Sequence, residues 1–409
     1  MVGAPRIRLV LIAAALAVAI IMRMFALLLA DHVTHYGDPL NYLHLAQAVA
    51  SGQGLSLVNS AGVLTPTGQF PPALPLLLGA VASFVALTPL TLVIVNTVID
   101  VIAALLLARL ATQLGRPDLG LPVALAYLVW PSIAFMAPLA YKEGLIIALM
   151  LATIVALLEQ SRRDGFRWAA LSGFAGGALV LTQPSLAPLL PLTFLVFLRR
   201  FGSARRWLEV CAAAAVATVA VMLPWWVRNA LVFGQFIPFT TSGGLALWVG
   251  AQPDGGMVWK LPPPEWSGAG EIEASRLAAT EAWRIIAADP AGYISRCMAK
   301  FPASFFKNNW AINQLVLTPG QPLPHLARSA ILRAGPTFAE LAVVILALVG
   351  WLRHRRLAIA WLLVACIAQV LIFSIWFEFS ERHRLFITPV WLLLAAMAVA
   401  RQPKQVTDA

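Results

Sequence analysis

Charged residues are scarce in this chain of 409 residues: they make up 11% of it, whereas 60% of the residues are hydrophobic. With a mean hydropathy of +0.82, the chain has too few polar residues to surround an apolar interior with a water-facing surface. The scarcity excludes a water-soluble enzyme domain and predicts an all-α integral membrane protein, whose partner is the lipid bilayer.

Cysteine and histidine are also rare. Two of the three cysteines, Cys211 and Cys366, lie in apolar runs, and Cys297 lies in a polar stretch, so no disulfide pair is evident. The six histidines show no metal-ligand spacing. We therefore expect no metal and no cofactor, while a divalent cation is not excluded.

Acidic residues number 18 against 29 lysines and arginines, which gives a net charge of +11. The basic residues do not follow one soluble face, so no nucleic-acid partner is expected. They lie in short clusters near the ends of apolar runs, at 109–116, 162–167, 199–206 and 353–356. The positive-inside rule assigns these clusters, with Arg6 and Arg8, to the cytoplasm.

Parity then constrains the path of the chain. We count about ten apolar segments of membrane-spanning length and one shorter candidate. Between the first span, 9–30, and the basic cluster that begins at Arg109, the chain must cross an odd number of times, yet the apolar stretches 72–87 and 90–114 both lie there. The shorter one follows two prolines and is predicted to lie at the interface without crossing. Asp38 and Glu143 then fall on the external side.

This path divides the chain into three parts. Residues 1–227 form a transmembrane module whose first external loop, 31–72, carries Asp38. Residues 228–335 form a long external loop, and 336–409 form the C-terminal transmembrane helices. Within the long loop, periodicity predicts amphipathic helices at 271–288 and 293–310.

Six features follow one another in a fixed order: Asp38 in the first external loop, PTGQFPPALPLLLG, APLAYKEG, GFAGGALVLTQP, PWWVRNALVFGQFIPFTTSGGLALWVGAQP and ERHRLFITPVWLLLAAMA. In this order the chain resembles the multispanning glycosyltransferases of the GT-C fold, which include protein O-mannosyltransferases and the aminoarabinose transferases acting on lipid A. The resemblance covers nearly the whole chain.

The resemblance implies a GT-C type bundle of about 10–11 transmembrane helices, with interfacial helices in the first external loop. It implies an inverting transfer of a sugar from a polyprenyl-phosphate donor to a hydroxyl of a glycan, lipid or protein, on the external face of a plasma or inner membrane. Gln183 stands where relatives often carry arginine.

Two acids are the catalytic candidates. The resemblance makes Asp38 the general base that takes the proton of the attacking hydroxyl, whereas Pro39 after it also suits a helix cap. Glu143 matches an acid of the family pattern, and it also favours the positive end of its own helix dipole. Tyr42 lies one turn after Asp38, and Lys142 either pairs with Glu143 or reaches the donor phosphate.

External cations are the candidates for holding that phosphate. Arg228 follows two tryptophans at an external membrane edge, and Arg382, His383 and Arg384 lie in the last external loop, so all four break the positive-inside rule. Binding of a lipid phosphate explains them, and so does snorkelling to headgroups.

Two other classes of function remain open. Asp100 and Asn96 share one face of a span, and an intramembrane acid suggests a transporter or a flippase for lipid-linked substrates. Polar contact between helices explains the same pair. A non-enzymatic envelope assembly subunit is the other alternative. Gly173, Gly176 and Gly177 are expected to permit close helix packing.

Overall fold

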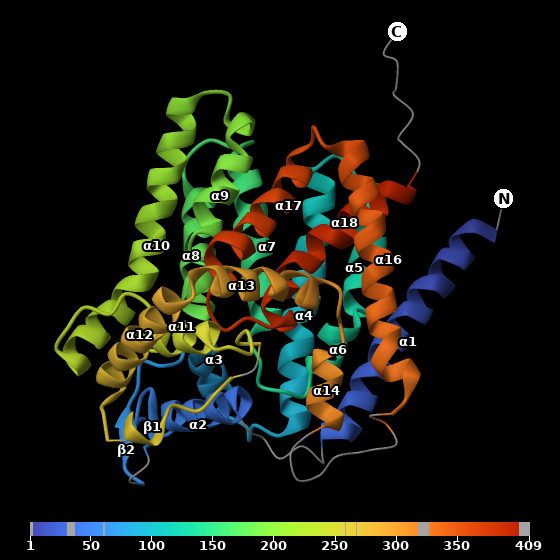
Figure 1. Cartoon of the computed structure of the whole chain (residues 1–409). Helices are drawn as coiled ribbons and strands as arrows, with labels where there is room; N and C mark the ends of the chain where they lie inside the picture. The colour runs from blue at the N-terminus through green and yellow to red at the C-terminus, as the bar shows by residue number, and fades with distance from the viewer. Residues whose placement is uncertain are drawn as a thin grey trace.

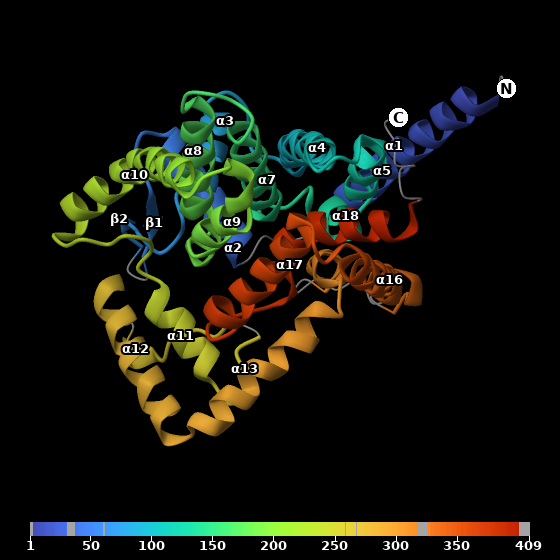
Figure 2. The same ribbon diagram turned by 90° about the horizontal axis from the view of Figure 1, so that it is seen from above.

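The computed structural model describes residues 3–30, 37–59, 62–257, 259–266, 268–317, 326 and 328–400, and His32, His35 and Tyr36 lie outside them. The described chain is mostly helical, and its long helices form a bundle with shorter elements gathered at one end (Figures 1 and 2).

The elements of the first half are α1 (Gly3–Ala30), α2 (Asp38–Ala50), β1 (Ser56–Val58), β2 (Leu64–Pro66), α3 (Ala73–Ala82), α4 (Pro89–Gln113), α5 (Pro117–Leu128), α6 (Pro131–Met136), α7 (Glu143–Gln160), α8 (Arg167–Thr182), η1 (Pro184–Leu186), α9 (Leu189–Val196) and η2 (Leu198–Phe201). Strands β1 and β2 form a small antiparallel hairpin in which Leu57 pairs with Thr65.

The elements of the second half are α10 (Ala204–Phe233), α11 (Gly243–Ala251), η3 (Pro264–Trp266), α12 (Glu271–Ala288), α13 (Pro290–Phe305), α14 (Trp310–Val316), α16 (Ala330–His354), α17 (Ala358–Gln369), the π-helical turn η4 (Val370–Ser374), the 3₁₀ helix η5 (Glu381–Ile387) and α18 (Thr388–Val399).

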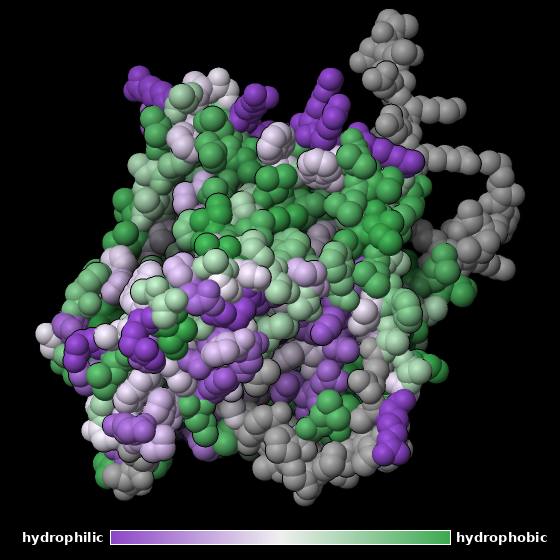
Figure 3. All heavy atoms as spheres, in the orientation of Figure 1, coloured by the Kyte–Doolittle hydropathy of each residue, from purple (hydrophilic) through white to green (hydrophobic). Residues whose placement is uncertain are grey.

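Six helices of the described chain are long and apolar enough to cross a bilayer, namely Leu9–Ala30, Pro89–Gln113, Glu143–Gln160, Ala204–Phe233, Ala330–His354 and Glu381–Val399. Hydrophobic side chains form a broad band over the upper half of the surface, and hydrophilic ones gather along its upper edge and over its lower half (Figure 3). These features indicate a multi-pass membrane protein and confirm the sequence-based prediction at this level.

The basic clusters and the polar loops lie at opposite ends of the bundle, as the count of membrane crossings predicts. The four connections that carry the basic clusters lie at its upper end in Figure 1, where α1 begins and α18 ends. Helices α2, α3, α11, α12 and α14 and the hairpin lie toward the opposite end. The first polar loop and the long late loop therefore meet at one end of the molecule.

Helix α3 does not cross the bundle. It has 10 residues, about 15 Å of helix against a hydrocarbon core of about 30 Å. It packs against α2 in a buried cluster that includes Tyr42, Leu45, Leu74 and Leu78. The two helices form a platform at the lower end of the bundle (Figure 1), in agreement with the parity argument.

Three predicted boundaries were wrong. The apolar run 119–135, one of the ten or so segments predicted to span the membrane, is broken into α5 and α6, because Trp130 before Pro131 adopts an extended conformation. Helix α10 continues through Arg228 and ends at Phe233, where Gly234, with a φ of 69°, is the C-cap. The predicted boundary at 227 therefore falls within a helix. The helix predicted over 293–310 is divided into α13 and α14, whereas 271–288 matches α12.

Helices α7 and α18 lie at the centre of the bundle. In each of these two spans 78% of the most apolar window is buried, against 17% in α1 and 22% in α10 and α16. The outer helices therefore expose apolar side chains where lipid would lie. The starts of the two central spans carry Glu143 and Arg382.

The glycines of α8 permit close contact with α10, as the sequence predicts. A Cβ atom on Gly173 would overlap with the carbonyl oxygen of Ala214, and one on Gly177 would lie 2.9 Å from the Cβ atom of Val221. By contrast, a Cβ atom on Gly243, in α11, would meet nothing within 4 Å.

We predict that Gly173→Ala destabilises the protein by about 1–3 kcal/mol, because the added methyl group forces α8 and α10 apart. Gly243→Ala is the matched control and should be neutral or slightly stabilising, since alanine favours helix in open space. Unfolding of both variants in mixed detergent micelles measures the difference. Equal stabilities of the two variants would contradict the packing described here.

Candidate functional site

The guanidinium of Arg382 is the centre of a charged cluster at the lower end of the bundle. Its Nη2 donates a hydrogen bond to Asp38 Oδ2 at 2.7 Å, and its Nη1 lies 3.6 Å from Glu143 Oε1. The group also lies over the rings of Tyr141 and Trp310, at 5.4 and 5.2 Å from their centroids. One buried cation thus joins the start of α2, the start of α7, η5 and α14.

The carboxylate of Asp38 is not used as the N-cap of its helix. It is the first residue of α2, and Gly37, with a φ of 63°, is the N-cap and makes no side-chain capping bond. The Asp38 side chain is 33% exposed. Burial acts to raise its pKa, but the charges of Arg382 and Lys142 and the hydrogen bond from Arg382 outweigh it, so the pKa is lower than usual. The carboxylate is therefore ionised at neutral pH.

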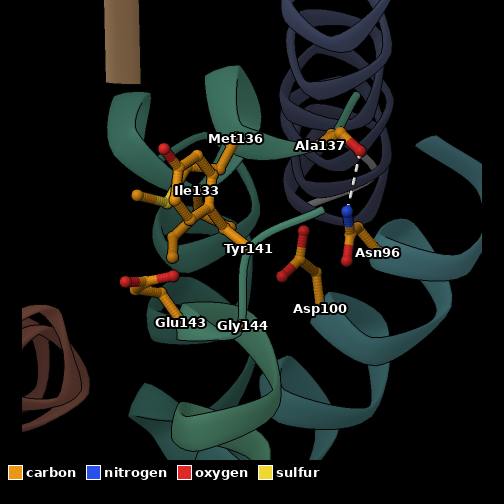
Figure 4. Close-up of a pocket in the computed structure, with 8 residues that line it drawn as sticks. All are labelled: Asn96, Asp100, Ile133, Met136, Ala137, Tyr141, Glu143 and Gly144. Atoms are coloured by element: carbon orange, nitrogen blue, oxygen red, sulfur yellow. Dashed lines mark hydrogen bonds between the residues drawn. The ribbon is translucent and has the colours of Figure 1, made fainter. Parts of the chain in front are cut away.

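Glu143 is more enclosed, with a side-chain exposure of 3%. Among the described residues its Oε2 atom has no hydrogen-bond partner. Glu143 lines a small pocket with room for about one water molecule. Figure 4 shows the eight residues that line this pocket: Asn96, Asp100, Ile133, Met136, Ala137, Tyr141, Glu143 and Gly144.

Asp100 lies on the opposite wall of this pocket and is paired. Its Oδ2 accepts a hydrogen bond of 2.7 Å from Arg23 Nη2, and Tyr127 Oη lies 3.5 Å from its Oδ1. Asn96 donates to the backbone oxygens of Ala137 and Leu139 (Figure 4). The polar groups of α4 thus link α1, α5 and the segment before α7.

Lys142 brings a second cation to the cluster. Its Nζ lies 5.9 Å from the ring centroid of Tyr42, and in the described part of the chain it forms no ion pair or hydrogen bond. Burial lowers its pKa, against the opposing effect of Asp38. Tyr42 is 1% exposed and packs edge-on against Phe70, so it forms a wall of the site.

Glu378 is a further acid at this site, which sequence reasoning missed. Its Oε2 lies 3.7 Å from His383 Nε2, and its side chain is 14% exposed. Burial raises its pKa to about 7, while Arg382 and Lys142 oppose this rise and Asp38 adds to it. Glu378 lies four residues before Arg382, next to the charged run ERHR at 381–384, and this proximity was the signal that could have identified it.

Two of the predicted phosphate ligands lie elsewhere. Arg228 donates to the backbone oxygen of Leu55 at 3.0 Å, and Leu55 follows the C-terminal end of α2. Asp38 is the first residue of this 13-residue helix, so the length of the helix places Arg228 roughly 20 Å from Asp38. Arg384 is fully buried and pairs with Glu340 at 2.6 Å. It also donates to the backbone oxygens of Ser304 and Lys307, so it fastens η5 to α13 and α16.

The structure therefore brings together a defined part of the predicted set: Asp38, Tyr42, Lys142, Glu143, Arg382 and, beside Glu378, His383. Nδ1 of His383 accepts a hydrogen bond from the backbone nitrogen of Ser380 at 3.0 Å. Within the described ranges no group of three or more histidine, cysteine or acidic side chains is placed to hold a metal ion.

We predict that Arg382→Gln destabilises the protein by about 3–5 kcal/mol, because it leaves the buried Glu143 without its cation. Adding Glu143→Gln should recover part of this loss, which unfolding of both single variants and the double variant in mixed micelles measures. Arg276→Gln, which breaks an exposed pair with Glu273, is the control and should change stability by less than about 0.5 kcal/mol. Additive effects of the two single changes would contradict the coupling.

The pKa of Glu378 predicts a pH-dependent stability. A carboxyl group with a pKa of about 7 in the folded protein and an ordinary value of about 4.3 when unfolded binds its proton more tightly in the folded state. Its contribution is present at low pH and is lost as the pH rises through about 7.

Between pH 5 and 8 the wild type should therefore lose stability relative to Glu378→Gln, by up to about 3 kcal/mol. Melting temperatures of both proteins in detergent across this pH range measure the difference. Parallel curves would show that the carboxyl group has an ordinary pKa.

Comparison with known proteins assigns no family to this chain: no protein-family model matches it, and neither does any curated protein.

Proposed function

We propose that the chain is an integral-membrane, inverting glycosyltransferase with a GT-C type bundle. It moves a sugar from a polyprenyl-phosphate donor to a hydroxyl of a glycan, lipid or protein. The observation that carries the proposal is the cluster itself: a partly exposed, ionised Asp38 bonded to the buried Arg382, beside the buried Lys142, which forms no ion pair or hydrogen bond with the described residues.

The charges of the cluster suit the two ends of the transfer step. The acceptor hydroxyl loses its proton to Asp38 while its oxygen forms a bond to the anomeric carbon of the sugar. The bond between that carbon and the phosphate oxygen breaks, and its electron pair stays on the phosphate. Lys142 and Arg382 stabilise the charge that develops there, so the leaving group needs no proton.

Arg382 has the capacity for this role without releasing Asp38. Its Nη2 bonds to Asp38, whereas its Nη1 has no hydrogen-bond partner among the described residues. Nη1 is itself buried, so a phosphate oxygen would satisfy this donor once the side chains around it have moved apart. Glu143, 3.6 Å from Nη1, would keep the guanidinium in place between the two anions, which makes it a positioning residue.

The surroundings of the cluster also support a lipid-linked donor. The platform of α2 and α3 lies beside it at the end of a bundle with an apolar surface, so a polyprenyl chain would stay in the bilayer while its phosphate reaches the cations. The basic clusters at the opposite end favour an external or periplasmic site, by the positive-inside rule.

The pairing of Asp100 favours this proposal over a transporter or flippase. An intramembrane acid that serves in ion-coupled transport needs access to its ion or substrate, whereas Asp100 is 2% exposed and bonded to Arg23. The pair suits helix association instead. An ion-coupled flux that depends on Asp100 would support the transporter alternative.

We predict that Asp38→Asn lowers sugar transfer by about 100-fold or more, because an amide does not accept the hydroxyl proton. Mass spectrometry of envelope glycans, glycolipids and glycoproteins from cells that lack the protein identifies the missing product, and complementation with each variant measures its return. Asp254→Asn, at an exposed acid paired with Lys260 in the late loop, is the control and should restore the product. Lys142→Gln should lower transfer as well.

Immunoblots of membrane fractions must show equal amounts of each variant. A glycan profile that does not depend on the protein, or full complementation by Asp38→Asn, would refute the proposal.

A further inference from the structure

The late external loop holds one segment of chain in a fixed position at the Asp38 site. Lys300 of α13 is 1% exposed, and its Nζ donates to the backbone oxygens of Ile375 and Phe377, each at 2.9 Å. Tyr293 Oη donates to the backbone oxygen of Trp376 at 2.5 Å. A buried lysine bound by carbonyl groups is costly to displace, so the residues just before Glu378 are rigidly placed.

Helix α11 fixes the same segment from its other side. The backbone nitrogen of Glu378 donates to the oxygen of Ala246 at 2.9 Å, and that of Phe379 donates to the oxygen of Gly256 at 3.2 Å. The segment follows the π-helical turn Val370–Ser374, a conformation that is frequent at functional sites. Backbone contacts thus position Glu378, and they leave its side chain unused.

The carboxyl group of Glu378 has no hydrogen-bond donor of its own in the described part of the chain. The contact of 3.7 Å with His383 Nε2 is longer than a hydrogen bond. The charged groups that act on it are Asp38, Lys142, Arg382 and Lys300. The side chain is 14% exposed, so a ligand can reach the carboxyl group and supply the hydrogen-bond donor that the described residues do not provide.

We propose that Glu378 binds a hydroxyl group of the sugar in the lipid-linked donor. The inference rests on the proposed function and names a residue for sugar recognition within it. An ionised carboxyl group repels a phosphate, and the proposed place of the phosphate is beside Lys142 and Arg382. A sugar hydroxyl suits Glu378 better, because it both donates and accepts hydrogen bonds. With a pKa of about 7, the carboxyl group offers either partner near neutral pH. Sites that bind a substrate hydroxyl in this way discriminate strongly against analogues that lack it.

The test compares a sugar-free compound with compounds that carry a sugar on the same farnesyl phosphate. The sugar-free compound is methyl farnesyl phosphate, and the others carry mannose, glucose or arabinose in place of the methyl group. All are phosphodiesters with one negative charge, and they differ in the sugar hydroxyls. Calorimetry with the full-length protein in lipid nanodiscs measures the affinity for each probe at pH 7.

The wild type should bind at least one sugar-bearing probe more tightly than methyl farnesyl phosphate. Glu378→Ala should lower the affinity for that probe by about 10-fold or more, the effect of leaving a buried hydroxyl unpaired. Its affinity for methyl farnesyl phosphate should stay within about two-fold, which also shows that the variant is folded. Glu378→Gln should retain part of the preference, because an amide also pairs with a hydroxyl. Glu273→Ala, on the exposed face of α12, is the control and should bind both probes as the wild type does.

The opposite results separate the two claims. The inference about Glu378 is wrong if the wild type binds no sugar-bearing probe more tightly than methyl farnesyl phosphate. It is also wrong if Glu378→Ala keeps this preference, or if the variant lowers the affinity for both kinds of probe equally. In each of these cases the proposed function stands. If no probe binds, or if Lys142→Gln binds the probes as tightly as the wild type, the proposed function fails and this inference fails with it.

Discussion

A buried guanidinium must be neutralised, and the site depends on how this chain neutralises Arg382. Asp38 and Glu143 provide the negative charges, and the rings of Tyr141 and Trp310 cover the guanidinium. Loss of any one partner would leave a charge in a poorly hydrated place. Since the partners come from distant parts of the chain, this single requirement fixes the first loop, the central helix α7 and the last loop relative to one another.

Two other buried cations hold the late loop in the same way. Lys300 binds backbone oxygens on the segment before Glu378, and Arg384 pairs with Glu340 while it donates to the end of α13. An apolar bundle supplies few directional contacts, so these polar contacts define the geometry at its end. The arrangement leaves Lys142 without an ion pair and Glu378 without a hydrogen-bond donor among the described residues, and the proposed donor, with its phosphate and sugar hydroxyls, would supply both partners.

Hydropathy and charge predicted a multi-pass helical membrane protein, a short α3 and a first polar loop at the end opposite the basic clusters, because these depend on composition along the chain. They also predicted about ten spans, whereas six helices of the described chain are long and apolar enough to cross a bilayer. The different contacts of Arg228, Arg382 and Arg384 could not be predicted. All three were predicted to break the positive-inside rule, yet their partners, a backbone oxygen, a partly exposed acid and a buried acid respectively, come from remote segments. Glu378 lies four residues before Arg382, so its place near the site could have been predicted, whereas the contacts with the late loop that fix its backbone could not.

The most direct test is a cryo-electron microscopy structure of the protein in nanodiscs with a bound farnesyl phosphoryl sugar. The account predicts the phosphate in hydrogen-bond contact with Lys142 Nζ and Arg382 Nη1, with the anomeric carbon facing Asp38 across a space for the acceptor hydroxyl. A phosphate bound away from both cations, with the contact between Arg382 and Asp38 unchanged and the cluster closed to the sugar, would contradict it.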